Sequence, residues 1–337
     1  MKYKLTACLF FISITLAAQD SIKWANHVIE NMPLGRGLDI NYSRIFKSNL
    51  VAESKVSRLT NNEVQTENFD NLEFDLKFPI YVGERTQVIG SGEYTYDRIQ
   101  FRNNATNNYE LFEILNKKEL RSRKLKFYVT HSLNRENFLK FRTSIELNGD
   151  VADTEQSFTE FAKYSLTAAY GWQKSAKNAY AVGLYMNYAL GRSTIYPVFE
   201  WNKTWNNTWG FESKLPAQFK VRYTPTKNLR VYAGYGVDGL SYRLVAPSDE
   251  TNILEEFEIR KSDLKFTLNI ERRLYDFIWI ATEGGLNYNI RFEVADNDKL
   301  YNNETIIDGQ LGTAPYLKFS LFLVPNESLK SLFGYNQ

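Results

Sequence analysis

The stretch that decides the fold is FAKYSLTAAYGWQKSAKNAYAVGLYMNYALGRSTIYPVFEW, residues 161–201. It contains two strand-length runs in which apolar and polar residues alternate, joined by a short polar turn. The apolar faces consist of Tyr164, Leu166, Ala168, Tyr170 and Trp172, followed by Tyr180, Val182, Leu184, Met186, Tyr188 and Leu190. The opposite faces are small or polar, with Lys163, Ser165 and Thr167 followed by Ala181, Gly183, Tyr185 and Asn187. A period of two over this length predicts a β-hairpin.

The same alternation continues on both sides of this hairpin. The predicted connections alternate between a short set, near residues 83, 135, 175, 206, 227 and 274, and a generally longer set, near residues 65, 110, 155, 192, 216, 250 and 303. Outer-membrane barrels show this asymmetry between their two ends. These thirteen connections predict about fourteen strands, within a range of twelve to sixteen, and an even number returns both ends of the wall to one side.

The strands predict an all-β fold, a closed antiparallel up-and-down transmembrane β-barrel over residues 36–325. Several predicted strands exceed about ten residues, the length that a tilted strand needs to cross hydrocarbon. Rings also gather where strands meet turns, as in the aromatic girdles of such barrels. They are Trp172, Trp201, Trp205, Trp209 and Tyr275. A soluble secreted β-protein that binds a ligand also alternates its faces, and it remains an alternative.

The two ends of the chain are predicted to lie outside the barrel. Lys2 and Lys4 precede the apolar run LTACLFFISITL and the small pair Ala17-Ala18, which predicts a signal peptide over residues 1–18. Residues 19–35 are predicted to be a periplasmic lead-in, and residues 326–337 a C-terminal tail. Cys8 lies at the start of the apolar run, where a lipid-anchoring cysteine is not expected, so the mature chain is expected to lack thiol chemistry.

Several local features carry their own predictions. Residues 61–70, 102–118 and 295–312 are polar and are predicted to be loops. Pro216 is expected to end a short strand because proline cannot donate to a ladder. Phe257 and Ile259 alternate in the opposite phase to Leu264 and the residues after it, which predicts a bulge within residues 261–263.

Residues for catalysis or metal binding are few. Two histidines, His27 and His131, are present, and the single cysteine falls in the signal peptide, so no metal site and no cofactor are expected. An enzyme acting on envelope lipid would depend on His131 beside Ser132, but no G-x-S-x-G accompanies them. The chain is therefore expected not to be an enzyme, and the lipid-modifying barrel is kept as an alternative.

The predicted inward faces carry charges of both signs. The candidate lumen-lining residues are Lys140, Arg142, Lys163, Lys220, Arg222, Arg230, Glu73, Asp75, Glu93, Asp238 and Glu283. One interpretation is a charged constriction that selects small solutes. The other is a closed, salt-bridged interior that holds the barrel rigid. A modest excess of positive groups would favour anions if the interior forms a pore.

The second half of the chain resembles a known family. The residues that carry the resemblance are Gly191-Arg192 with Pro197, the Trp205/Trp209 pair, Leu215-Pro216, Arg222-Tyr223, Asp238-Gly239 with Tyr242-Arg243, and Trp279 with Gly284-Gly285 before Phe292. Residues 161–292 are similar to an uncharacterised Gram-negative outer-membrane β-barrel family, a domain of unknown function. The resemblance implies an outer-membrane location and brings no activity, ligand or catalytic residue.

These observations favour an outer-membrane β-barrel that acts as a narrow passive channel or a structural envelope component. The expected partners are outer-membrane lipid, the barrel-assembly machinery during biogenesis, and small solutes. The net charge of +2 over 337 residues gives no basic footprint for nucleic acid.

Overall fold

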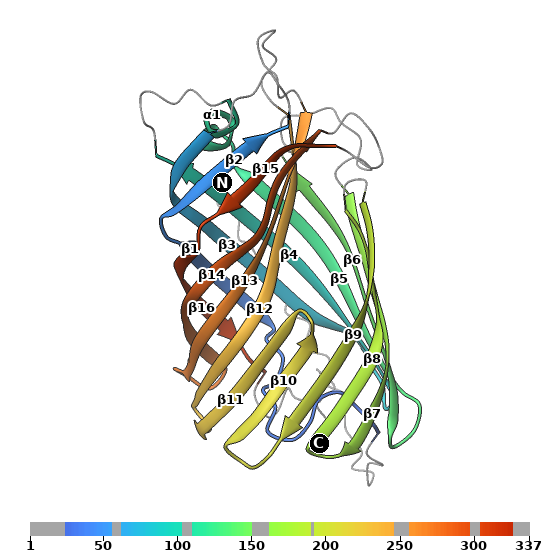
Figure 1. Ribbon diagram of the computed structural model, residues 1–337. Helices are drawn as coiled ribbons and strands as arrows, with labels where there is room; N and C mark the ends of the chain where they lie inside the picture. The colour runs from blue at the N-terminus through green and yellow to red at the C-terminus, as the bar shows by residue number, and fades with distance from the viewer. Residues whose placement is uncertain are drawn as a thin grey trace, which may run out of the picture.

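The computed structural model describes residues 24–55, 62–102, 110–149, 162–189, 192–245, 256–296 and 304–325. The predicted signal peptide with Cys8 and the C-terminal tail lie outside these residues. All strands of the described chain join one sheet that curves into a tall barrel (Figure 1), and its pairings are antiparallel apart from a single parallel contact of β6 with β12. The elements are β1 (Leu38–Ile45), β2 (Ser48–Ser54), β3 (Asn62–Val82), β4 (Thr86–Phe101), α1 (Glu110–Lys117), β5 (Leu120–Ser132), β6 (Asn137–Gly149), β7 (Ala162–Ser175), β8 (Asn178–Ala189), β9 (Arg192–Thr204), β10 (Trp209–Leu215), β11 (Gln218–Thr226), β12 (Leu229–Val245), β13 (Glu256–Arg273), β14 (Ile278–Asp296), β15 (Thr305–Leu311) and β16 (Ala314–Leu323).

The barrel has fourteen strand positions, because two of its strands are interrupted. β1 and β2 both pair with β3, and β15 and β16 both pair with β14. The pairings β1–β16 and β2–β15 close the ring. The predicted closed antiparallel barrel of about fourteen strands is therefore confirmed.

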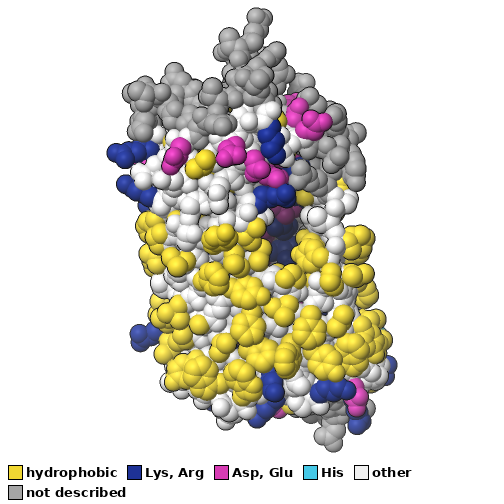
Figure 2. Space-filling view, in the orientation of Figure 1, with side chains coloured by type: hydrophobic (Ala, Val, Ile, Leu, Met, Phe, Trp, Pro, Cys, Tyr) yellow, Lys and Arg dark blue, Asp and Glu magenta, His cyan; other side chains and the backbone are white. Residues whose placement is uncertain are grey.

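An apolar belt surrounds the barrel, since its exposed side chains come from strands all around the ring. Figure 2 shows one face of this belt. Its large side chains are exposed in the isolated chain and alternate with covered residues on the same strands, as Leu184 does with Ala181 and Gly183. The belt includes Leu76, Phe78, Leu125, Phe127, Phe141, Ile145, Leu166, Leu184, Ile195, Phe266, Leu268, Leu286, Phe319 and Leu321. Exposed aromatic side chains lie at the end of the barrel where short turns connect the strands. They are Trp201, Trp205, Trp209 and Tyr275. Such a belt with aromatic residues at its border is the surface of a membrane-spanning barrel.

Above this belt the two faces of the wall exchange character: the apolar side chains point inward and the polar side chains point outward. We call this change the inversion of polarity. At the upper end, the inward side chains are apolar and fully covered, among them Leu50, Ile99, Phe257, Phe292 and Val294. α1 covers this upper core with the buried side chains Leu111 and Leu115. The described part of the chain contains no helix long and apolar enough to cross a membrane.

This inversion corrects three loop predictions. β3 occupies most of residues 61–70, α1 lies within residues 102–118, and β15 with the end of β14 lies within residues 295–312. The predictions were wrong because these segments stand above the belt. There the outward side chains are polar, as Glu63 and Glu67 are, and the outward apolar signal of a membrane strand is lost.

The inversion also explains the phase change in β13. Phe257 and Ile259 point inward into the upper core without any bulge in their own strand. The register does shift between Ser262 and Asp263, but the extra residue is Ile290 of the partner strand β14. The bulge is thus close to the predicted place and on the neighbouring strand.

Not all strands reach the upper end. β6 and β12 meet there in a parallel pairing of Gly149 with Arg243, so the upper core is surrounded, among the described strands, by β2–β6 and β12–β15. β10 ends at Leu215, as Pro216 predicts, and the β10–β11 hairpin covers only the lower part of the wall. The lower barrel is therefore wider than its upper end.

The segment of residues 24–37 lies across the lower mouth of the barrel, where Figure 1 shows it as a dark blue trace. Ala25 packs against Phe138, Ala169 and Ala181 of the wall. Its backbone is held by Ser132 Oγ, which donates to the Ala25 carbonyl at 2.6 Å. The predicted lead-in thus contacts the inner wall, and we call its described part the N-terminal segment.

Candidate functional site

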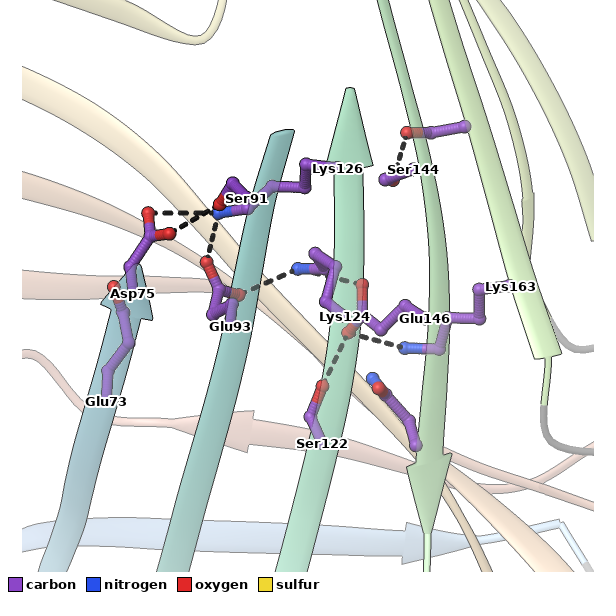
Figure 3. A network of polar contacts seen from close by, with 12 residues as sticks. Glu73, Asp75, Ser91, Glu93, Ser122, Lys124, Lys126, Ser144, Glu146 and Lys163 are labelled. Carbon is purple, nitrogen blue, oxygen red and sulfur yellow. Dashed lines mark hydrogen bonds and ion pairs between the residues drawn. The ribbon is translucent and has the colours of Figure 1, made fainter. Parts of the chain in front are cut away.

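A ladder of alternating charges crosses the inner wall from β3 to β7 (Figure 3). Lys126 Nζ lies 3.2 Å from Asp75 Oδ2 and also bonds Glu93. Lys124 Nζ lies 3.2 Å from Glu93 Oε1 and 2.8 Å from Glu146 Oε2. Each cation is thus shared by two carboxylates, which offsets much of the cost of removing these charges from water.

Most of the other predicted lumen residues also have partners. Lys140 bonds Glu200, Arg222 Nη1 lies 2.6 Å from Glu212 Oε1, and Lys265 Nζ lies 2.7 Å from Asp238 Oδ2. Further partners are Glu271 for Arg230, Asn41 for Glu73, Tyr316 for Glu283, and Glu146 for Lys163. All eleven predicted residues lie on the side of the wall opposite the apolar belt, although they do not converge on one point.

The interior holds three chambers, each with charged side chains in its lining, between the upper core and the N-terminal segment. The first chamber, of about 370 Å³, contains Arg142, Lys220, Asp238 and Glu283 in its lining. We call it the window chamber because, above the β10–β11 hairpin, no strand of the described chain closes the wall between β9 and β12. The lower chamber, of about 360 Å³, contains Lys140 and Arg142 and is covered by His27 and Arg36 of the N-terminal segment. The central chamber, of about 240 Å³, contains Glu73, Glu93, Asp238 and Glu283. Shared lining residues make the window chamber the neighbour of both others.

Three cations around the window chamber have no carboxylate in reach. Arg142, Lys214 and Lys220 make no ion pair within 4.0 Å with any carboxylate of the described chain. In total, four cations and two carboxylates line this chamber, with Lys265 already paired to Asp238. The chamber therefore carries an excess of positive charge that an anionic group would neutralise.

Both ends of the interior are covered. Above, the apolar upper core fills the ring of β2–β6 and β12–β15. Below, the N-terminal segment is bonded across the mouth, with Asn202 Nδ2 donating to the His27 carbonyl at 3.2 Å and Thr204 Oγ1 donating to the Glu30 carbonyl at 2.7 Å. The interior is thus a group of capped chambers along the barrel axis.

His27 of the N-terminal segment faces the lower chamber, as Arg36 does. Burial lowers the pKa of His27 to about 3, with a further lowering from Lys140 and an opposing effect from Glu200. Its ring therefore stays neutral at neutral pH. If His27 were protonated, a second cation would lie beside Lys140, and the two cations would repel each other.

The arrangement around His131 does not form a hydrolase site. His131 is on the outward face of β5 with Leu125 and Phe127, and its Nδ1 lies 2.7 Å from Thr86 Oγ1. Ser132 points to the opposite face, because neighbours on a strand alternate, and its hydroxyl donates to Ala25. No group of three or more potential metal ligands is found among the described residues.

Sequence reasoning missed Lys214, Glu200 and Arg36. Glu200 shares the inward face of β9 with Val198, and the period of two would have placed it there. Lys214 stands next to the end of a short strand, and so few alternating residues do not show which face of the strand points inward. Arg36 lies outside the strands and is held by Asp39 and Glu271, both at 2.7 Å, a placement that no local pattern indicates.

Among solved structures, the chain is similar to a Pseudomonas aeruginosa FadL homologue, with a TM-score of 0.42 and 8% identity over 85% of this chain and 89% of that one. It is similar to an outer-membrane channel from Pseudomonas putida F1, with a TM-score of 0.41 and 9% identity over 91% and 100%. It is also similar to the outer membrane phospholipase of Salmonella typhi, with a TM-score of 0.31 and 8% identity over 88% and 94%. No family model matches the chain, and no curated protein matches it. At these identities the similarity concerns the barrel fold, which the strand pairing establishes by itself.

Proposed function

We propose that this protein is a narrow channel of the cell outer membrane, closed along its axis in the present conformation and favouring anions. The membrane location is supported by the apolar belt and its aromatic border. Lipid would contact the belt, and the barrel-assembly machinery would insert the chain. The longer connections of the upper end would face outward, as in other outer-membrane barrels.

The observation that carries the channel proposal is the covering of the lower mouth by the N-terminal segment. The segment is no part of the sheet, and side chains and hydrogen bonds attach it to the wall. Ala25 and Leu34 make apolar contacts, Arg36 pairs with Glu271 at 2.7 Å, and several hydrogen bonds join its backbone to the wall. A barrier of this kind can leave the mouth without breaking the wall. The lower and window chambers behind it share Arg142 and Lys214.

Conductance in planar bilayers tests this proposal. The wild type is expected to be nearly silent. A variant without residues 24–35 loses the lower barrier but keeps the upper core, so it is expected to show frequent, brief conductance events, each of which also requires a momentary opening of the upper core. Their reversal potential is expected to favour chloride. A double variant, Ser132→Ala with Asn202→Leu, removes two donors that hold the segment and is expected to open intermittently. Ser175→Ala, at an exposed position of β7, serves as its control.

Heat-modifiable gel migration must show that each variant is folded. A folded deletion variant that remains silent would overturn the channel and leave a structural envelope role. Release of the wild type from membranes without detergent would favour the soluble ligand-binding alternative instead. The lipid-modifying enzyme gains no support from the geometry of His131 and Ser132.

A further inference from the structure

The wall of the barrel has a lateral window above the β10–β11 hairpin. β10 has 7 residues and β11 has 9, whereas the flanking β9 and β12 have 13 and 17. The pairing of β10 with β9 ends at Leu215 and Phe199, and that of β11 with β12 begins at Gln218 and Gly236. Above these pairs, the facing edges of β9 and β12 have no strand between them in the described chain.

The window chamber lies behind this opening. Its lining includes Tyr196 and Val198 from β9, Ala217 from the hairpin turn, and Gly236 and Asp238 from β12. Figure 2 shows a recess in this face, with charged side chains at its floor and hydrophobic side chains around it. On the outer surface beside the window, Ile195 is 64% exposed and Val237 is 45% exposed, so its flanks belong to the apolar belt.

The rim of the window is adapted to the missing strand. In lipid, each unpaired backbone group costs several kcal/mol. The Ser241 carbonyl of β12 accepts hydrogen bonds from Lys163 Nζ at 2.5 Å and Asn148 Nδ2 at 2.9 Å. The Gly239 amide donates to Asp238 Oδ1 at 3.0 Å. Side chains thus satisfy backbone groups that a neighbouring strand would otherwise pair.

We propose that the window admits an anionic amphiphile sideways from the surrounding lipid layer. Its anionic head group would lie in the window chamber near Arg142, Lys214 and Lys220, and its hydrocarbon chains would stay in the bilayer along Ile195 and Val237. This inference names the solute class of the proposed channel and so rests on that function, but its test measures binding and does not depend on conductance.

Charge and size together select this occupant. The three unpaired cations come from β6, β10 and β11 and surround one chamber, where charge-assisted bonds to phosphate or carboxylate are stronger than bonds between neutral groups. A volume of about 370 Å³ is near the lower end of small-molecule sites, which span roughly 300–1,000 Å³. It suits a head group better than a complete lipid, and the apolar flanks leave the chains a place outside.

Binding of phosphatidylglycerol, compared with phosphatidylcholine of the same acyl chains, tests the proposal by native mass spectrometry of the full-length protein. Gly236→Trp fills the chamber, because a Cβ at Gly236 meets no heavy atom within 4 Å. Gly92→Trp is the matched control, since a Cβ there also meets nothing and Gly92 shares the outward face of its strand. Lys214→Gln with Lys220→Gln removes two of the cations and leaves the wall intact.

The wild type is expected to retain phosphatidylglycerol at least tenfold better than phosphatidylcholine. Gly236→Trp and the double lysine variant should lose most of this difference, whereas Gly92→Trp should keep it. Equal retention of both lipids, or equal retention by the two tryptophan variants, would overturn the proposal. Inorganic phosphate that binds alone and displaces the lipid at equal concentration would show a site for free anions and would also overturn it.

Discussion

Lys163 of β7 donates a hydrogen bond to the carbonyl oxygen of Ser241 in β12, with 2.5 Å between Nζ and oxygen. Four strands, β8–β11, separate β7 from β12 in the order of the sheet. The same ammonium group lies 3.9 Å from Glu146, the last carboxylate of the charge ladder. One side chain thus joins the interior ladder to the rim of the window.

Replacing Lys163 with Met is expected to lower the stability of the barrel by about 1–3 kcal/mol, because the Ser241 carbonyl loses its shorter donor. Glu146 stays paired with Lys124 at 2.8 Å, so the ladder itself should persist. The temperature at which the heat-modifiable band shifts measures the change. Lys174→Met, at an exposed position of the same strand, should leave that temperature unchanged.

Replacing Lys126 with Met is expected to destabilise the barrel by about 1–3 kcal/mol, because Asp75 and Glu93 lose their shared cation. Each carboxylate keeps one other cation, Lys77 at 3.1 Å and Lys124 at 3.2 Å respectively, which limits the loss. The double variant with Glu93→Gln removes one of these charges and should recover part of the loss. Equilibrium unfolding in urea measures both. Equal stabilities of the single and double variants would show that Asp75 and Glu93 are not coupled through Lys126.

Substituting Gly285 with Ala is expected to prevent or slow folding, because the new Cβ would lie 1.8 Å from the backbone oxygen of Phe266 on β13. Backbone atoms of a paired strand cannot rotate away as a side chain can. Gly92→Ala, where nothing lies within 4 Å, is the matched comparison and should fold normally. The folded fraction after dilution into detergent, read from gel migration, distinguishes the two.

His27 makes stability fall as the pH falls from about 6.5 to about 3. In this range the unfolded chain takes up a proton at the imidazole and the folded chain does not, so acid favours the unfolded state. His27→Gln should flatten the dependence over that range. The difference between wild type and variant in the band-shift temperature at pH 7.5, 5.5 and 4.5 isolates this residue from other acid-titrating groups. Parallel profiles would contradict the assignment.

The sequence predicts the membrane-spanning part of the wall well. In residues 161–201, alternation gives the correct faces for Leu184 and Ala181, because lipid on one side and a packed interior on the other impose a clear period of two. The upper wall could not be predicted in the same way. There the outward side chains meet water, and the apolar members of β3 and β13 point into a core that includes α1, which is remote in sequence.

The sequence predicts which charged side chains point into the barrel, but it does not predict which of them form ion pairs with one another. Whether Lys220 has a partner depends on which residues face it across the barrel, and strand periodicity contains no such information. The lateral window could not be predicted from the sequence either. Pro216 indicated a short strand, but the gap also requires the greater length of β12 and its contact with β6.

The inversion of polarity along the strands fixes how deeply the barrel sits in a bilayer. Raising it would bring the apolar belt into water, and lowering it would bring Glu63, Glu67 and their neighbours into hydrocarbon. Both displacements are unfavourable, so the wall sets its own depth without an anchor elsewhere. The window, at the height where the inward side chains change from charged to apolar, is thereby held near the head groups of one lipid layer.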